Sequence, residues 1–95
     1  MKKEERMTKD ILGNIGGKEN VQSIAHCMTR LRLTLKDEAK ANIGELKKID
    51  GVMGVIEDDT LQIVVGPGTV NKVAAEMSNI VGLAIGEKAA VDEEN

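Results

Sequence analysis

Six residues in the first half of the chain alternate strictly between polar and apolar side chains, reading Arg-Leu-Arg-Leu-Thr-Leu over residues 30–35. Successive side chains of a β-strand point to opposite faces of a sheet, so this alternation predicts a strand with one leucine face and one polar face. The leucine face requires partner strands and a second layer to cover it. The chain is therefore expected to fold around a sheet that is covered on one face.

The spacing of apolar residues elsewhere predicts three helices and four strands in the order αββαββα. We expect the helices over residues 8–15, 43–49 and 70–84 and the strands over residues 20–26, 28–36, 52–56 and 61–65. Thr8 and Asn42 are the expected N-caps of the first two helices. The pattern predicts the α+β class, as a two-layer sandwich with a four-stranded antiparallel sheet and three helices on one face. The order in which the two hairpins pair does not follow from the sequence.

The two ends of the chain differ in composition from its middle. Residues 1–7 are mostly charged and are expected to form a frayed leader, whereas residues 87–95 are expected to form an acidic tail or linker. Residues 8–86 are long enough for one domain with a modest core. Residues 66–68 read Gly-Pro-Gly but match no complete phosphate-binding motif, so we expect a turn that leads into the last helix.

Composition argues against several classes of protein. The chain has no Phe, Tyr or Trp and a formal net charge of −3, which disfavours both base stacking and a basic nucleic-acid footprint. No apolar run is long enough to cross a bilayer and no signal peptide is visible, so we expect no direct membrane insertion. The single cysteine predicts a reducing, cytoplasmic setting. We expect no metal or other cofactor, because Cys27 and His26 alone cannot supply a normal ligand set.

The single cysteine, Cys27, stands just ahead of the alternating strand. Arg30 and Arg32 would surround its thiol with positive charge, which lowers a thiol pKa and favours the nucleophilic thiolate. Guanidinium groups also hold phosphate through paired hydrogen bonds. However, a lone cysteine is often a small buried hydrophobe, and outward arginines often form only a solvated face. The residues by themselves leave the functional and the structural interpretation of Cys27 open.

The same stretch resembles the phosphorylation-site signature of IIB domains in the bacterial phosphoenolpyruvate-dependent sugar phosphotransferase system. The similarity is to the glucose, β-glucoside, sucrose and N-acetylmuramate superfamily of those domains. The residues that fill the signature are Asn20, Cys27, Thr29, Arg30, Leu31, Leu33, Leu35 and Asp37. Residues 50–55, Asp-Gly-Val-Met-Gly-Val, and residues 61–66, Leu-Gln-Ile-Val-Val-Gly, resemble two later elements of the family. The resemblance thus extends over most of the chain.

The resemblance implies a phosphoryl relay. In the family, a IIA domain carrying phosphohistidine passes its phosphoryl group to the IIB cysteine, here Cys27, and the cysteine passes it to a sugar held in a membrane IIC domain. This activity is that of a protein-phosphohistidine–sugar phosphotransferase. The resemblance also implies an open sheet face for docking, and a cytoplasmic location tethered to the inner face of the membrane through IIC.

The resemblance to IIB domains also implies roles in phosphoryl transfer for the residues around Cys27. Arg30 and Arg32 are the expected catalytic charge partners, and the backbone N–H groups from Met28 to Arg30 are expected to form an anion-binding nest. The hydroxyl of Thr29 is suited equally to a phosphate oxygen and to stabilising the turn. We expect His26 at the rim of the site or in a structural role, rather than as a second phosphoryl carrier.

Two other classes of function remain open at this stage. A ligand-sensing regulatory domain would tolerate replacement of Cys27, and a regulatory protein-interaction domain would act without transport. The sequence does not identify the sugar that the protein would phosphorylate. His26 beside Cys27 favours the β-glucoside and sucrose branch of the family and leaves the N-acetylmuramate branch open. The oligomeric state is equally undetermined. The first-residue methionine and the acidic tail favour an N-terminal place in a longer IIBC or IIABC chain over a stand-alone subunit.

Overall fold

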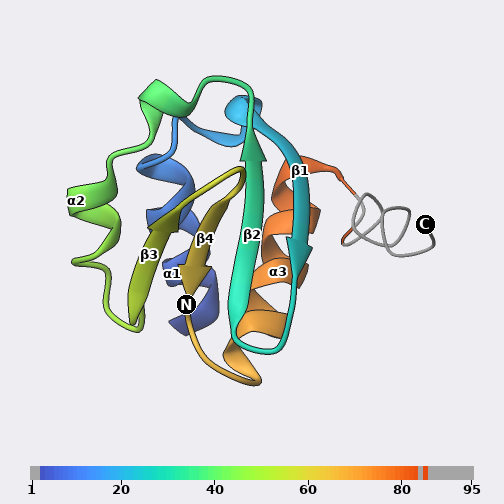
Figure 1. Cartoon of the computed structure of the whole chain (residues 1–95). Coiled ribbons are helices and arrows are strands. Elements are labelled where there is room, and N and C mark those ends of the chain that lie inside the picture. Colours follow the sequence, from blue (N-terminus) through green and yellow to red (C-terminus); the bar gives the residue numbers. More distant parts are fainter. Residues whose placement is uncertain (1–2, 84, 86–95) are drawn as a thin grey trace.

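The alternating segment forms strand β2, Arg30–Leu35, inside a four-stranded antiparallel sheet (Figure 1). The computed structural model describes residues 3–83 and 85. Its remaining strands and its helices are α1 Lys3–Gly13, β1 Val21–His26, α2 Ile43–Leu46, β3 Gly54–Glu57, β4 Leu61–Val64 and α3 Thr69–Val81. Single 3₁₀ turns at Lys18–Asn20 and Glu38–Lys40 complete the order. The predicted αββαββα order and α+β class are confirmed.

The sheet has the order β1-β2-β4-β3, so the two hairpins join through their second strands. β2 pairs with β4 so that Arg30 lies opposite Val64 and Leu33 lies opposite Leu61. Because β2 and β4 run in opposite directions, the β1–β2 turn and the C-terminal end of β4 lie at the same end of the strands (Figure 1). The β3–β4 turn lies at the opposite end of the strands. This topology decides which loops can build a common site.

The core lies between the sheet and helices α1 and α3, which cover one face (Figure 1). Leu31, Leu33 and Ile63 are fully buried on the covered face of the sheet. On α3 the predicted apolar stripe is buried at Val70, Val73, Ala74 and Met77 and half-buried at Ile80 and Val81, while its last member, Ala84, lies outside the described residues. Burying each large aliphatic side chain contributes about 1.5–3 kcal/mol. No helix within the described residues is both long and apolar enough to span a membrane.

Helix α1 begins earlier than the sequence pattern predicts. It starts at Lys3, so the expected frayed leader is helical from Lys3 to Met7, and Thr8 lies inside the helix rather than at its N-cap. The Thr8 hydroxyl is fully buried and donates to the carbonyl of Glu4 at 2.7 Å, which satisfies a polar group that would otherwise disfavour the helix interior. Residues 1–2 of the leader and 86–95, which include the whole predicted tail, lie outside the described residues.

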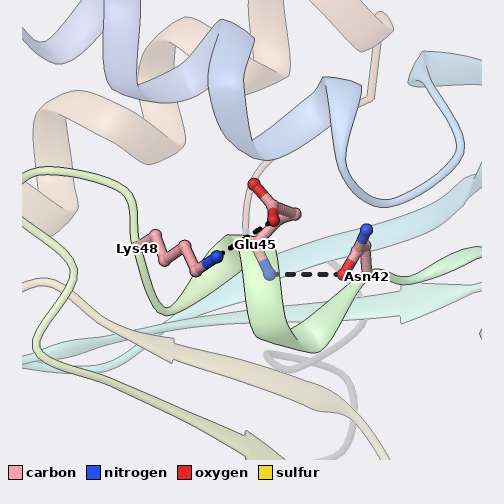
Figure 2. Close-up of polar contacts among 3 residues, drawn as sticks. All are labelled: Asn42, Glu45 and Lys48. Carbon is pink, nitrogen blue, oxygen red and sulfur yellow. Dashed lines mark hydrogen bonds and ion pairs between the residues drawn. The ribbon is translucent and has the colours of Figure 1, made fainter.

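Helix α2 is a single turn, shorter than expected, and lies beside the β3 edge of the sheet (Figure 1). Its predicted cap is confirmed, because the side-chain oxygen of Asn42 accepts from the backbone N–H of Glu45 at 3.2 Å (Figure 2). The Glu45 carboxylate does not reach back to Asn42, as a full capping box requires, and instead lies 3.4 Å from the ammonium of Lys48 (Figure 2). The N–H of Asn42 donates to the carbonyl of Asn14 at 2.7 Å, which ties α2 to the end of α1.

Candidate functional site

Cys27 lies in the short loop that joins β1 to β2, at the end of the sheet where β4 also ends (Figure 1). Its side chain is exposed, as a reactive cysteine requires. The loop is closed from within, because the N–H of Cys27 donates to the carbonyl of Arg30 at 3.0 Å. It is also held from outside, because the carbonyl of Thr29 accepts from the N–H groups of Val65 at 3.0 Å and Gly66 at 3.1 Å. The end of β4 therefore fixes the cysteine loop.

The predicted Gly-Pro-Gly turn leads into α3, as expected, and also supports the cysteine loop. Gly66 has a φ of 94°, in the left-handed region that favours glycine. A Cβ at this position would lie 2.8 Å from the terminal methyl carbon of Met53, but that exposed side chain is flexible and can move, so the backbone conformation is what requires glycine. A side chain here would disturb the backbone N–H that holds Thr29.

The surroundings of Cys27 favour its thiolate. Partial burial raises the pKa of the thiol, but hydrogen bonds from the backbone N–H groups of Arg30 and Thr29, together with the guanidinium of Arg32, outweigh this and hold the pKa below its usual value. The two N–H groups belong to the segment expected to form an anion nest. A lowered pKa increases the thiolate fraction of a cysteine at a given pH, and the thiolate is its nucleophilic form.

The two arginines of β2 differ in what they contact. Arg32 acts on the thiol both through its charge and through a side-chain hydrogen bond. The guanidinium of Arg30 contacts β4, where its Nη1 donates to the side-chain oxygen of Gln62 at 2.8 Å. Sequence reasoning did not single out Gln62 as a site residue. The signal was present, because Gln62 lies between Leu61 and Ile63 in an alternating strand and so shares the open face with the arginines.

His26 is half-buried at the end of β1 and contacts the backbone of the cysteine loop. Its Nδ1 lies 3.2 Å from the carbonyl oxygen of Cys27, so the imidazole donates to this carbonyl when the proton is on Nδ1. This contact fits a residue at the rim that steadies the loop. Among the described residues, no group of three or more His, Cys, Asp or Glu side chains is placed to hold a metal ion.

Asn20, the first residue of the signature, lies at the opposite end of β1 from the cysteine. Six residues of strand separate them, which is about 20 Å at the usual rise of an extended chain. The Asn20 amide donates to the carbonyls of Ile15 at 2.7 Å and Asp37 at 2.9 Å and accepts from the N–H of Asp37 at 2.9 Å. Asn20 is therefore a structural residue that ties the chain after α1 to the end of β2.

Exposed apolar side chains occur in the cysteine loop and at the third strand. The exposed large hydrophobic residues of the described part are Met28, Met53 and Ile56. Met28 is in the cysteine loop, Met53 contacts the position of Gly66, and Ile56 pairs with Gln62 across β3 and β4. Met28 is 81% exposed and directly follows Cys27 in the chain, so it is accessible beside the thiol.

The fold and the site define a class of protein. It is a small α+β domain that presents an exposed cysteine with a lowered thiol pKa on a hydrogen-bonded loop, at one end of a sheet whose other face is open. The comparisons with known proteins agree with this class. Residues 9–42 match the family described as phosphotransferase system, EIIB. One domain of the PTS system IIabc component from Clostridium difficile has the same fold, with a TM-score of 0.78 and 38% identity over 87% of this chain and 86% of that one. The chain belongs to the EIIB family of the phosphotransferase system.

Longer relatives are also similar. The MurNAc-GlcNAc-specific EIIBC component of the phosphotransferase system from Staphylococcus epidermidis is 48% identical over 98% of this chain. The component of the same description from Staphylococcus haemolyticus is 51% identical over 92% of this chain. The chain spans 20% of the length of the first relative and 18% of the second.

Proposed function

We propose that this domain relays a phosphoryl group from the phosphohistidine of a IIA domain, through Cys27, to a sugar bound in a IIC membrane domain. The observation that carries the proposal is the exposed Cys27 thiol, whose pKa is held low by Arg32 and by the backbone of its own loop. A lone structural cysteine would need neither the exposure nor the positive surroundings. Membership of the EIIB family makes this role preferable to ligand sensing or to protein interaction without transfer.

The relay consists of two displacements at phosphorus. In the first, the Cys27 thiolate attacks the phosphoryl group, the S–P bond forms as the N–P bond breaks, and the IIA histidine leaves. In the second, a sugar hydroxyl attacks, the O–P bond forms as the S–P bond breaks, the hydroxyl proton passes to solvent, and the thiolate is regenerated. A lowered thiol pKa assists both steps, because more thiolate is present to attack and a less basic thiolate leaves more readily.

The groups around Cys27 stabilise charge rather than form bonds. Phosphoryl transfer depends mainly on positioning and on stabilising the charge spread over the phosphoryl oxygens. Arg32 and the N–H groups of Thr29 and Arg30 face the sulfur, so they are placed to contact those oxygens once the S–P bond has formed. The backbone contacts from Val65 and Gly66 keep the loop in place through both steps.

The relatives favour one substrate class. The staphylococcal proteins are described as specific for MurNAc-GlcNAc, and they favour the N-acetylmuramate branch over the β-glucoside and sucrose branch that His26 suggested. Their description as EIIBC components supports a IIC partner and a location at the inner face of the membrane. We therefore propose an N-acetylmuramate-containing sugar as the final acceptor.

The test is incubation of the domain with phosphoenolpyruvate, the general phosphotransferase proteins and candidate IIA domains, followed by intact mass measurement. The expected result is the addition of one phosphoryl group that maps to Cys27. An unmodified mass in the presence of a IIA domain that phosphorylates a staphylococcal relative would contradict the proposal, and so would a phosphoryl group on His26. Transfer to the sugar is then measured with the domain joined to its IIC domain, comparing MurNAc-GlcNAc with a β-glucoside.

A further inference from the structure

Gln62 is a polar residue of the open face that contacts an arginine of the site and that the relay, as described so far, does not use. It lies on β4 directly opposite Arg32 in the strand register, yet its side-chain oxygen accepts from Arg30, which pairs with Val64. The contact is therefore diagonal across the two central strands. Its 2.8 Å length is that of a well-formed charge-assisted hydrogen bond. This bond gives the Arg30 side chain a fixed direction on a surface where a long side chain would otherwise be free.

The bond separates the two arginines by function. Arg32 lowers the pKa of Cys27 through its guanidinium, whereas Arg30 lowers it only through its backbone N–H. The guanidinium of Arg30 is thus not engaged with the thiolate in the domain before phosphorylation. Because a guanidinium has five N–H donors and Gln62 accepts one bond, the remaining donors are available to an anion on the open face.

The chemistry of glutamine suits this task better than that of an acid. A carboxylate at the same position would also hold Arg30, but it would cancel the positive charge and repel a phosphoryl group. The neutral amide oxygen fixes the guanidinium and leaves its charge in place. An apolar residue would do neither, since the partner strand would then offer Arg30 no side-chain acceptor at this place.

We propose that Gln62 is a positioning residue that holds the Arg30 guanidinium on the open face, ready for the phosphoryl group as the S–P bond of Cys27 forms and the N–P bond of the donor breaks. The proposal rests on the proposed relay. On this view Arg32 lowers the pKa of the thiol, and Arg30, positioned by Gln62, stabilises the negative charge of the transferred phosphoryl group. Gln62 acts on the rate of transfer only through Arg30.

The test is a double-mutant cycle read by two independent measurements. Gln62→Met keeps the length of the side chain but removes the amide, and Gln22→Met makes the same change at an exposed position of β1. The rate of transfer from phosphorylated IIA to Cys27 is measured together with the thiol pKa, obtained from the pH dependence of alkylation. We expect Gln62→Met to slow transfer by about tenfold without raising the thiol pKa, as loss of a hydrogen bond to a charged group predicts. Gln22→Met is expected to change neither.

The cycle distinguishes positioning from general structural damage. In the Arg30→Gln background, Gln62→Met should produce no further slowing, whereas in the Arg32→Gln background its slowing should add to that of the arginine change. Equal slowing in both backgrounds, or a wild-type rate for Gln62→Met, would overturn the proposal. If Gln62→Met does not fold, Gln62→Ala serves instead. It also removes the acceptor of Arg30 without adding charge, so it should slow transfer and leave the thiol pKa unchanged, and a wild-type rate would again overturn the inference. Failure of the unaltered domain to accept phosphate would count against the relay itself.

Discussion

At one end of β1 the side chain of Asn20 is buried and makes three hydrogen bonds, whereas at the other end the thiol of Cys27 is exposed and its loop is held through backbone groups. Asn20 bonds to Asp37, 17 residues further along the chain, and uses both N–H donors and the oxygen of its amide. The side chain of Cys27 is exposed and can react, and its loop is held in place by the hydrogen bonds between the carbonyl of Thr29 and the backbone that follows β4. Both residues belong to one sequence signature, yet their physical roles differ.

The difference shows how a small domain separates stability from reactivity. Buried polar groups that are completely hydrogen-bonded make a fold specific, and one lost partner is expensive. A phosphoryl carrier needs the reverse, an accessible group with unsatisfied capacity near positive charge. The strand between the two ends keeps them about 20 Å apart, so a change at one end should leave the other intact. The following predictions test that separation, from the largest expected effect to the smallest.

Cys27→Ser should abolish phosphoryl transfer and leave the fold unchanged. A serine hydroxyl is a far weaker nucleophile than a thiolate near neutral pH, and the exposed thiol makes no contact that the core requires. Transfer is measured by intact mass after incubation with phosphorylated IIA, and folding by the urea midpoint. Retained transfer by the serine variant would remove Cys27 from the relay, and a large loss of stability would show that the reactive end also supports the fold.

Asn20→Ala should destabilise the domain by about 3 kcal/mol, because it leaves buried carbonyl and N–H groups without partners. The thiol pKa of the folded variant should stay as it is in the unaltered domain. Urea unfolding measures the first quantity and the pH dependence of alkylation the second. Asn79→Ala, at an exposed position of α3, is the matched control and should cost about 0.5 kcal/mol or less. A shifted thiol pKa in Asn20→Ala would show that the two ends are coupled.

Arg32→Gln should raise the thiol pKa, because it removes both the charge and the side-chain hydrogen bond that favour the thiolate. The pH profile of alkylation should therefore move to higher pH, and transfer should slow by about one to two orders of magnitude. Arg30→Gln should slow transfer with a much smaller change in the profile, since its guanidinium contacts Gln62. Arg32→Lys should restore the thiol pKa better than the rate, because an ammonium lacks the planar two-pronged contact. Equal pKa shifts for both Gln variants would contradict this division.

Met28→Ser should weaken docking of the phosphorylated IIA domain and leave the chemistry intact. Met28 is exposed beside the thiol, so its burial against a partner would contribute to binding. We expect the KM for phosphorylated IIA to rise by about fivefold, with kcat and the thiol pKa unchanged. Ala39→Ser, in the exposed 3₁₀ turn that follows β2, is the control for a polar substitution at the end of the sheet opposite to the cysteine loop. An unchanged KM would place the docking surface away from the cysteine loop.

Local patterns in the sequence determined most of the elements. The alternation of residues 30–35 and the apolar stripe of α3 predicted β2 and the longest helix, because the periods of 2.0 and 3.6 residues are local properties of the backbone. The same logic gave the cysteine loop, the Asn42 cap and the turn before α3. It failed at Thr8, where a threonine that suits an N-cap is accommodated inside a helix by bonding to the preceding turn.

Only the tertiary structure decided how these elements meet. The pairing of β2 with β4 joins residues about 30 positions apart, and no local period encodes which strands of two hairpins become neighbours. That pairing brings Gln62 to Arg30 and the N–H groups of Val65 and Gly66 to Thr29. By contrast, the separation of Asn20 from Cys27 follows from strand β1, which lies between them and which the sequence predicts. The sequence determined which residues are chemically capable, and the non-local packing of two hairpins decided which of them act together, because side-chain contacts depend on distance in space rather than along the chain.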